Sequence, residues 1–358
     1  MKNLILTIIG ARPQFIKAAV VSRALSDIGT GISEEIVHTG QHHDPNMSEI
    51  FFADLGIPTP AVNLGIRGGG HGEMTGRMLA ALEQEMLSRK PAMVLVYGDT
   101  NSTLAGALAA TKLHIPVAHV EAGIRSFNRR MPEEVNRVLT DHVSVLLLAP
   151  MKAAMDNLAR EGLAPLAHHV GDVMYDAALS FSEVARKRST MLDQLSLLPK
   201  SYALATVHRA ENTDDPAKLA GIVGGLERIA GHCRVILPLH PRTRGRLREL
   251  GLIIKGVELL DPVSYLDMII LEQNARVILT DSGGIQKEAY FHGVPCVTLR
   301  EETEWVETVS AGWNQLTGAD AERMFRAFQS ASPGRPIDEY GGGIAARRIA
   351  TLLAKRVS

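Results

Sequence analysis

The chain is expected to fold as two doubly wound α/β domains, and three features of its sequence lead to this prediction. Short apolar runs alternate with longer amphipathic segments, the alternation restarts near residue 201, and 358 residues exceed what one ordinary core holds. Apolar runs separated by amphipathic stretches are typical of a parallel sheet that helices cover on both faces.

The first half of the chain supplies one set of alternating elements. Strands are expected at NLILTIIG, EEIVHTG, AMVLVYGD, PVAHVEAG and VSVLLLAP. Between and after them, helices are expected at residues 13–25, 47–55, 73–88, 100–113 and 132–142.

The second half repeats the pattern with strands at SYALATVHR, CRVILPLHP, VILTDSGG and VPCVTLR, and with helices at residues 218–229 and 285–293. We place the boundary in the segment GDVMYDAA, which gives an N-terminal domain of residues 1–172 and a C-terminal domain of residues 173–342. A last helix, 343–355, is expected to pack back on the first domain.

The composition excludes several classes of function. A net charge of −1 and 4% aromatic residues give no basis for nucleic-acid binding. The apolar run near the N-terminus is too short to span a membrane and lacks a signal-peptide cleavage site. Cys233 and Cys296 lie far apart and are interpreted as buried thiols in a reducing compartment. These features predict a cytoplasmic protein with no membrane partner.

The turn after the first strand, GARPQFIK, has the residues of an anion site. Gly10 allows a tight turn, Pro13 suits the first turn of a helix, and Arg12 and Lys17 add positive charge. The turn is not GxGxxG, so no nicotinamide cofactor is indicated. The alternative is that Arg12 only caps or pairs within the structure.

Two carboxylates follow expected strands. Asp99 comes after AMVLVYG and Glu121 comes after PVAHV. Because ligands of α/β proteins bind at the carboxyl ends of strands, these acids are candidates for chemistry. The alternative for Asp99 is an N-cap of the helix that follows it.

The helix that begins after Met131 adds a third carboxylate in its first turn. Glu133 and Arg137 are four residues apart and share a helix face. Glu134 is expected to be the solvated neighbour. The alternative is that Glu133 and Arg137 form an ordinary surface pair.

The second half carries a candidate nucleotide site. Glycines between a strand and a helix present backbone N–H groups to a phosphate, and they occur here in the turn formed by Ser282, Gly283 and Gly284. Glu288 lies about one turn further and has the chemistry to bind a ribose diol. His208 and His240 each end a strand segment, where a lone histidine is more often structural.

A catalytic metal is not expected. The histidine pairs at 42–43 and 168–169 have no third ligand at a spacing typical of metal sites, and the sequence has no DxD motif.

Eight segments of the sequence together resemble the non-hydrolysing UDP-N-acetylglucosamine 2-epimerase family. They occur in order over most of the chain: GARPQFIK, HTGQH, YGDTNSTLAGALAA, PVAHVEAG, MPEEVNR, VHRAEN, LHPR and LTDSGGIQKEA. The resemblance implies a glycosyltransferase-B-like fold with two Rossmann-like domains, an active site in the interdomain cleft, no cofactor and a homodimer.

Four further tracts resemble one branch of that family: FIKAAVVSRAL, NMSEIFFADLGIP, GGGHGEMTGRML and RSFNRRMPEE. This resemblance implies conversion of UDP-2,3-diacetamido-2,3-dideoxy-glucuronate to its manno isomer, for a surface polysaccharide such as lipopolysaccharide. The sugar carboxylate at C6 needs a cation, and the arginine-rich loop with Arg125, Arg129 and Arg130 is the nearest supply.

The resemblance also assigns roles to residues. Asp99, Glu121 and Glu133 match the acid/base carboxylates. The family's groups that hold or adjoin the UDP correspond to Arg12, Lys17, Arg137, His208 and His240, to the turn at Ser282, Gly283 and Gly284, and to the ribose-binding Glu288. His208 is also a catalytic candidate. The segment GIRGGGHGEMT lacks the pattern of the allosteric UDP-sugar site found in some members, although Gln41, His42 and Arg67 remain near it.

Four functions share these features: the diacetamido-glucuronate epimerase, a UDP-N-acetylglucosamine 2-epimerase (hydrolysing or not), a UDP-sugar-dependent glycosyltransferase and a non-catalytic UDP-sugar sensor. Three carboxylates near one sugar favour an epimerase, because inversion of C2 needs acid/base groups on both faces of the ring.

Overall fold

The computed structural model of the protein describes residues 3–29, 31–41 and 56–357. The helix expected at 47–55 and the histidine pair at 42–43 lie outside the described residues. The chain divides into two compact units: unit 1 comprises Met1–Ala177 and Asp338–Ser358, and unit 2 comprises Ala178–Ile337. The division falls inside a helix, α7 (Val173–Arg188).

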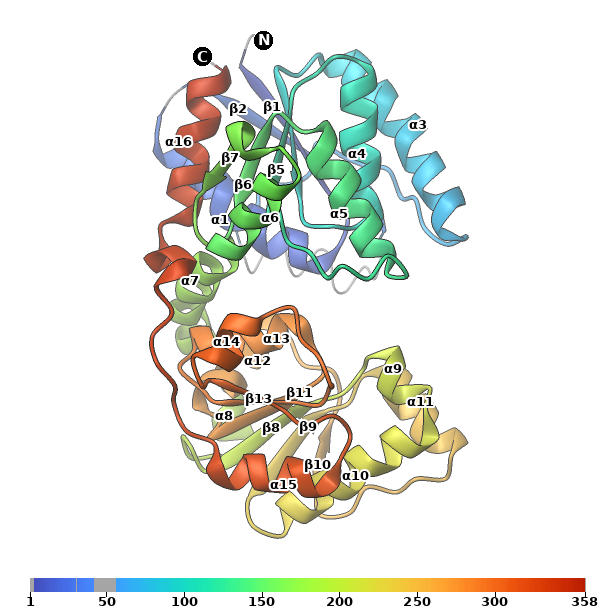
Figure 1. The fold of residues 1–358 in the computed structure, drawn as a ribbon, viewed down its shortest axis with the longest axis vertical. Helices are drawn as coiled ribbons and strands as arrows, with labels where there is room; N and C mark the ends of the chain where they lie inside the picture. The colour runs from blue at the N-terminus through green and yellow to red at the C-terminus, as the bar shows by residue number, and fades with distance from the viewer. Residues whose placement is uncertain (1–2, 30, 42–55, 358) are drawn as a thin grey trace. The chain divides into compact units, whose positions relative to one another are not determined.

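Unit 1 is built on a seven-stranded sheet whose strands are all parallel (Figure 1). The order is β3-β2-β1-β4-β5-β6-β7. The strands are β1 (Leu4–Ile9), β2 (Ser33–His38), β3 (Val62–Asn63), β4 (Met93–Tyr97), β5 (Val117–Val120), β6 (Leu146–Ala149) and β7 (Ala167–His169).

Unit 2 repeats this plan with six parallel strands in the order β10-β9-β8-β11-β12-β13. They are β8 (Tyr202–Thr206), β9 (Arg234–Pro238), β10 (Glu258–Leu260), β11 (Val277–Thr280), β12 (Cys296–Thr298) and β13 (Asn314–Leu316). The predicted α/β fold class is confirmed.

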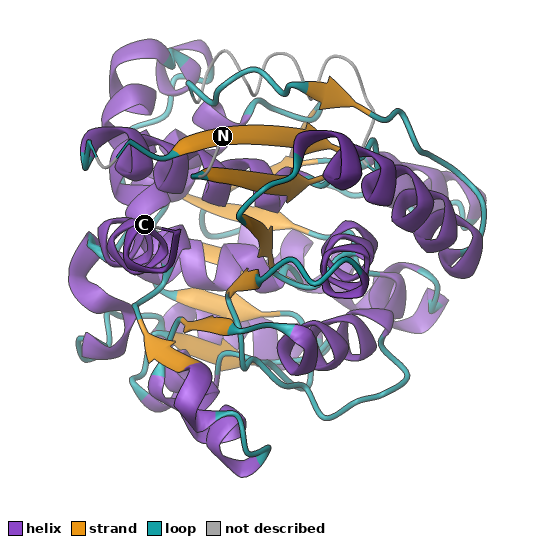
Figure 2. Ribbon diagram, turned by 90° about the horizontal axis from the view of Figure 1, so that it is seen from above, coloured by secondary structure: helices purple, strands orange, loops and turns teal. Residues whose placement is uncertain are grey.

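Helices lie on both sides of the strands (Figure 2). In unit 1 they are α1 (Arg12–Asp27), α3 (His71–Arg89), α4 (Asn101–Lys112), α5 (Pro132–Val143), α6 (Lys152–Arg160) and α16 (Ala345–Val357). Unit 2 contains α8 (Met191–Gln194), α9 (Ala210–Thr213), α10 (Pro216–Ala230), α11 (Pro241–Glu249), α12 (Tyr265–Asn274), α13 (Gly283–Phe291), α14 (Val306–Ser310) and α15 (Ala321–Ser330).

Each sheet is the centre of its unit's core, because helices shield its central strands from both sides. All six residues of β1 are buried, as are all five of β4 and all five of β8. A strand that is covered on both faces reads as a continuous apolar run rather than an alternating one, which explains why these strands were visible in the sequence.

The last helix belongs to unit 1, where α16 packs against α1 (Figure 1). The carboxylate of Asp176 accepts hydrogen bonds from the N–H groups of Ala345 (3.2 Å) and Ala346 (2.8 Å). These contacts satisfy two N–H groups that the first turn of a helix otherwise leaves unpaired. None of the helices in the described parts of the chain is long and apolar enough to cross a membrane.

Candidate active site

The strand order of each sheet identifies one place where a ligand is expected to bind. In unit 1 the order reverses between β1 and β4, and in unit 2 it reverses between β8 and β11. At such switch points the connections leave in opposite directions and open a crevice at the carboxyl ends of the strands. The turns after these strands contain most of the residues that the sequence singled out.

The turn after β1 requires glycine at its first position. A Cβ on Gly10 would lie 2.0 Å from Thr39 Oγ1 and 2.3 Å from Ser102 Oγ, so only glycine fits. Gln14 holds the turn, because its Oε1 accepts hydrogen bonds from the N–H groups of Gly10 (2.8 Å) and Ala11 (3.0 Å). Sequence reasoning missed Gln14, whose role depends on this local geometry.

The two cations of this turn have different environments. Arg12 is the first residue of α1 and is half-buried, which leaves part of its side chain accessible beside the helix N-terminus. Lys17 lies in the second turn of α1 and is buried, and its ammonium group pairs with the carboxylate of Glu121. The charge of Lys17 is therefore directed at an acid/base candidate.

Glu121 has an unusual backbone conformation. It follows β5 directly and has φ of 73°, a left-handed value that costs a residue with a side chain about 1–2 kcal/mol. Its carboxylate approaches Gly98, where a Cβ would lie 3.3 Å from Glu121 Oε2. Only 13% of the side chain is exposed. The fold thus holds this carboxylate in a strained, sheltered position at a strand end.

Asp99 is not a helix cap. The N-cap of α4 is Thr100, whose side chain accepts a hydrogen bond from the N–H of Thr103, so the alternative reading of Asp99 fails. The Asp99 carboxylate instead pairs with Arg137 through Nη2 and Nε, the latter at 3.1 Å. Asn136 Nδ2 donates to the Asp99 carbonyl at 2.9 Å.

The two glutamates at the start of α5 differ in burial, and the prediction that Glu134 is the solvated one is wrong. Glu134, expected to be solvated, is buried, and its carboxylate accepts from the N–H groups of Ser126 and Phe127, both at 2.9 Å, and from Arg137 at 2.8 Å. Burial alone would raise the pKa of Glu134, but these hydrogen bonds and Arg137 lower it overall. Glu133, as a result, is the exposed one, in the first turn of α5.

This arrangement also changes the partner of Arg137. It pairs with Glu134 and Asp99, where the sequence suggested a face shared with Glu133. Glu134 lies three residues before Arg137 and Glu133 lies four before it, so both are within reach of the same arginine on a helix, and the buried glutamate makes the contact.

Arg125 is a structural residue, which corrects the suggestion that it could meet the C6 carboxylate. Its side chain is 1% exposed and pairs with Asp141 and Glu161, each at 2.7 Å. The remaining arginines of this loop, Arg129 and Arg130, are exposed.

In unit 2, Asp281 organises the turn after β8. This buried residue directly follows β11, and its carboxylate accepts from the N–H groups of His208 (3.1 Å) and Arg209 (3.0 Å) and from Asn212 Nδ2 (3.1 Å). It therefore joins the two loops at the switch point. Sequence reasoning passed over Asp281, although it precedes the glycine-rich turn directly.

The two histidines are neighbours. The rings of His208 and His240 are 5.5 Å apart. Burial lowers the pKa of His208, and Asp281 only partly opposes this; burial and Arg242 also lower the pKa of His240. Both rings are consequently neutral at pH 7, and His240 Nδ1 caps α11 by accepting from the N–H of Arg242.

The glycine-rich turn opens α13, with Ser282 at its N-cap. A Cβ on Gly283 would make only ordinary contacts, 3.4 Å from Trp305 Nε1 and 3.6 Å from Arg209 Nη2, so lack of space does not require glycine here. Gly284 is exposed, and Glu288 lies half-buried in the second turn. A nine-residue helix with an open first turn provides N–H groups for a phosphate.

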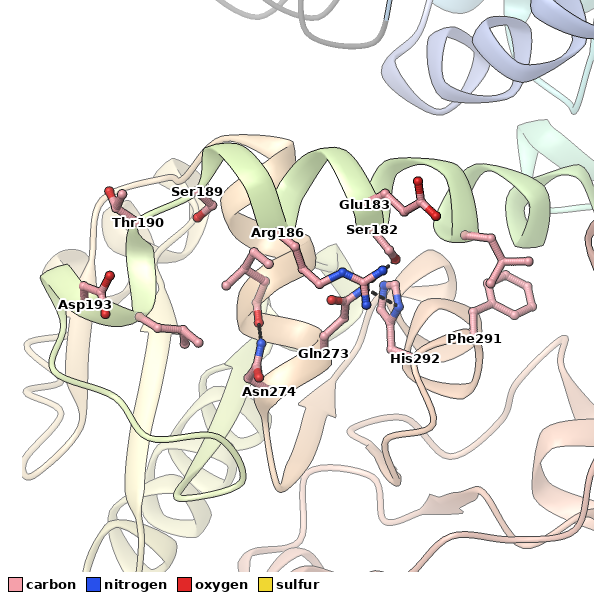
Figure 3. A pocket seen from close by; sticks show the side chains of 13 residues that line it. Ser182, Glu183, Arg186, Ser189, Thr190, Asp193, Gln273, Asn274, Phe291 and His292 are labelled. Atoms are coloured by element: carbon pink, nitrogen blue, oxygen red, sulfur yellow. Dashed lines mark hydrogen bonds between the residues drawn. The ribbon is translucent and has the colours of Figure 1, made fainter.

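A cavity of about 720 Å³ lies at the other end of α13 (Figure 3). It is lined by α7, α8, α12 and the end of α13, and Gln273 donates to Ser182 Oγ in its wall. His292 lines it too, and burial lowers the pKa of His292 to about 4. None of the residues assigned to nucleotide or sugar lines this cavity. Within the described ranges, no group of three His, Cys, Asp or Glu side chains is placed to hold a metal ion.

Two parallel sheets with charged groups and a glycine-rich helix start at their switch points define an α/β protein of the nucleotide-binding class. The sequence pattern described as UDP-N-acetylglucosamine 2-epimerase matches residues 27–354. The chain belongs to the UDP-N-acetylglucosamine 2-epimerase family.

The chain is similar over nearly its whole length to other members of that family. It is 56% identical to the UDP-2,3-diacetamido-2,3-dideoxy-D-glucuronate 2-epimerase of Pseudomonas aeruginosa, over 98% of this chain and 99% of that protein. The structure of Methanocaldococcus jannaschii UDP-GlcNAc 2-epimerase in complex with UDP-GlcNAc and UDP matches with a TM-score of 0.86 and 43% identity, covering 98% of this chain and 99% of that one. UDP-GlcNAc 2-epimerase from Neisseria meningitidis bound to UDP-GlcNAc matches with a TM-score of 0.90 and 30% identity, covering 98% and 100%.

Proposed function

We propose that this protein converts UDP-2,3-diacetamido-2,3-dideoxy-glucuronate to its manno isomer without net hydrolysis, as a step in making a surface polysaccharide. UDP leaves from C1 and a proton leaves from C2, which gives a 2-acetamidoglycal. A proton then returns to the other face of C2 while UDP adds back to C1. Atoms balance over the cycle, so no cofactor is needed.

The observation that carries this proposal is Glu121, whose backbone is strained and whose carboxylate lies next to the end of β4. β4 and β5 are neighbours in register, with Tyr97 opposite Val120, so their turns bring Asp99 and Glu121 to the same sheet edge. A left-handed, sheltered glutamate is costly for a purely structural role, which supports a functional one.

The acid/base work is assigned to Asp99, Glu121 and Glu133. Removing and returning a proton on opposite faces of C2 needs at least two such groups. Each of two carboxylates has a cation as its partner: Glu121 pairs with Lys17, and Asp99 pairs with Arg137. These pairs hold the two carboxylates in place for proton transfer.

Unit 2 is assigned the nucleotide. The first turn of α13 offers N–H groups to the diphosphate, and Glu288 offers a carboxylate to the ribose hydroxyls. The pKa of His208 is lowered mainly by burial, so the ring is neutral in the free protein and donates one N–H to the diphosphate as negative charge develops there. In unit 1, the half-buried Arg12 at the start of α1 is likewise assigned to an anion.

The choice of sugar follows the P. aeruginosa relative, which is named for this substrate. We assign the C6 carboxylate to Arg129 or Arg130, because Arg125 is committed to Asp141 and Glu161. Arg129→Ala and Arg130→Ala are expected to reduce the preference for the uronate sugar roughly 10-fold or more in kcat/KM, as loss of a charge-assisted contact does. Arg125→Ala should destabilise the fold instead and leave the preference unchanged.

The alternative substrate is UDP-N-acetylglucosamine, which is the named ligand of the M. jannaschii and N. meningitidis structures. An NMR assay of one UDP-sugar at a time in D₂O tests the reaction type. We expect both C2 isomers, still linked to UDP, with deuterium at C2. Free sugar and UDP would indicate a hydrolysing epimerase, and an unchanged substrate with bound UDP-sugar would indicate a sensor or a glycosyltransferase without its acceptor.

We further propose that the enzyme acts in the cytoplasm as a homodimer. Support for self-association comes from α5, where Val135 and Leu139 are one turn apart and 42% and 45% exposed. Light scattering after gel filtration should give twice the chain mass. Leu139→Asp should shift the protein to the monomer, whereas Leu198→Asp, at an exposed position of unit 2, should not.

A further inference from the structure

His119 lies beneath the two strand ends that carry Asp99 and Glu121. It is the third residue of β5 and is fully buried. Its Nδ1 lies 2.7 Å from Asp141 Oδ1, and its Nε2 lies 2.7 Å from the carbonyl oxygen of Gly98. Neither the ring nor Asp141 has a part in the assignments above.

The partners of the ring determine its protonation. A backbone carbonyl only accepts hydrogen bonds, so Nε2 must donate to Gly98. An ionised carboxylate also only accepts, so Nδ1 must donate as well if Asp141 is ionised. The two contacts at 2.7 Å are both satisfied as hydrogen bonds when each ring nitrogen of His119 carries a hydrogen.

Asp141 is ionised for reasons that do not depend on the ring alone. Its Oδ2 accepts from the N–H of Gly123 at 3.0 Å and pairs with Arg125 at 2.7 Å. Burial acts to raise the pKa of Asp141, but His119 and Arg125 lower it below its ordinary value.

Asp141 and Glu161 both pair with Arg125, but their environments differ. Glu161 is 27% exposed and also lies 3.8 Å from His142 Nδ1, so solvent screens its charge. Asp141 is fully buried, and a buried carboxylate is costly unless hydrogen-bond donors surround it. His119 Nδ1 completes that set of donors around Asp141.

His119 and Asp141 are linked to Asp99 and Glu121 by hydrogen bonds to the neighbouring backbone. Gly98, which precedes Asp99, donates its N–H to the Val120 carbonyl and accepts from His119, so both of its polar groups are fixed to β5. Gly123, which lies two residues after Glu121, is fixed by Asp141. Gly98 and Glu121 both have left-handed φ, which glycine adopts freely but which a glutamate keeps only with support from its surroundings.

We propose that His119, held doubly protonated between Asp141 and Gly98, is a positioning residue that fixes the turns of Asp99 and Glu121 for proton transfer at C2. It touches no substrate. The kinetic part of this proposal rests on the proposed epimerase function, whereas the state of the ring does not.

The first test is independent of substrate. In protein labelled with ¹⁵N-histidine, the His119 signals are assigned by their loss in His119→Gln. We expect both ring nitrogens of wild type to show the shifts and couplings of protonated nitrogens at neutral pH. A ring with only one hydrogen would overturn the proposal, even if the enzyme proves to be an epimerase.

The second test uses Asp141→Asn, which keeps the side-chain shape and removes its charge. We expect kcat to fall roughly 10- to 100-fold, as small misplacements of catalytic groups do, with KM and UDP affinity changed less than about 3-fold. The isotope effect on kcat for substrate deuterated at C2 should rise, because proton transfer becomes slower. Loss of thermal stability alone would not change that isotope effect.

His168→Gln on β7 is the matched control for His119→Gln, since it makes the same substitution in the same sheet. It should leave kcat and the isotope effect unchanged. A folded Asp141→Asn or His119→Gln with wild-type kcat and isotope effect would overturn the proposal. If neither variant folds, the His119 signals are assigned instead by through-bond correlation to the His119 backbone, and the ring nitrogens of wild type still decide the proposal. An inactive wild type with a doubly protonated ring would reject the proposed function and leave the assignment of the ring intact.

Discussion

The ammonium group of Lys17 lies against the carboxylate of Glu121, and only 8% and 13% of these two side chains are exposed. The pair joins the second turn of α1 to the residue that follows β5. Lys17 and Glu121 are 104 positions apart in the chain, and their pair thus connects two distant elements beside the switch point. Because the attraction between the two groups offsets part of the cost of removing each of them from water, this contact accounts for a lysine and a glutamate that are both sheltered.

The three carboxylates are expected to be needed for turnover and not for nucleotide binding. Asp99→Asn, Glu121→Gln and Glu133→Gln should each lower kcat by roughly 10²-fold or more, because each removes a general acid or base. UDP affinity, measured by calorimetry, should be nearly unchanged. Asp27→Asn at the exposed end of α1 is the control. A variant that turns over normally would remove its residue from the acid/base set.

Substitutions of Glu133 and Glu134 should differ in their effect on stability, because only Glu134 is buried. Glu134→Gln should lower the free energy of unfolding by roughly 1–3 kcal/mol, because a buried acceptor of two N–H groups and Arg137 is weakened. Glu133→Gln should change that free energy by less than about 0.5 kcal/mol, since its side chain is exposed. Chemical denaturation and turnover assays measure both. Equal stability losses in the two variants would contradict the assigned environments.

Gly10 should tolerate no side chain. In Gly10→Ala the new Cβ would overlap Thr39 and Ser102, and we expect a loss of roughly 1–3 kcal/mol in stability together with weaker UDP binding. Gly76→Ala in α3 is the matched control, because nothing lies within 4 Å of its Cβ position. That variant should gain about 0.5–1 kcal/mol through helix propensity. A Gly10→Ala protein of normal stability and UDP affinity would show that the turn adapts.

His292 makes stability depend on pH. Its pKa is lowered from 6.5 to about 4 by burial, so between these values the unfolded chain binds a proton that the folded protein does not. Stability should therefore fall as the pH drops from about 6.5 to about 4, by up to about 3 kcal/mol from this residue. His292→Gln should flatten that part of the pH profile in urea unfolding. An unchanged slope would mean that His292 titrates normally.

Much of the fold was predictable from the sequence because the central strands are covered on both faces. Runs such as LILTII and MVLVY are almost entirely apolar and are followed directly by a glycine, which makes them visible without any structure. The edge strands β3, β7, β10 and β13 were not predicted. They have two or three residues each, too few for a pattern, and owe their conformation to pairing with a neighbouring strand.

The sequence predicted where the carboxylates of the site lie in the fold, but it did not predict which side chains they contact. Asp99 and Glu121 could be placed at strand ends because the carboxyl ends of parallel strands share one edge. The exchange of roles between Glu133 and Glu134 could not, since it depends on where Ser126 and Phe127 present their N–H groups. Arg125 looked like its exposed neighbours until its partners Asp141 and Glu161 were placed.

The proposal that this protein is a C2 epimerase of the diacetamido-uronate sugar is tested most directly by comparing two substrates. The measurement is kcat/KM of the wild-type protein for UDP-2,3-diacetamido-2,3-dideoxy-glucuronate and for UDP-N-acetylglucosamine, each followed by NMR of the anomeric and C2 protons. We predict the manno isomer of the uronate sugar, still linked to UDP, as the product of the faster reaction. A higher kcat/KM for UDP-N-acetylglucosamine would contradict the assigned substrate, and a lack of C2 inversion with either sugar would contradict the reaction itself.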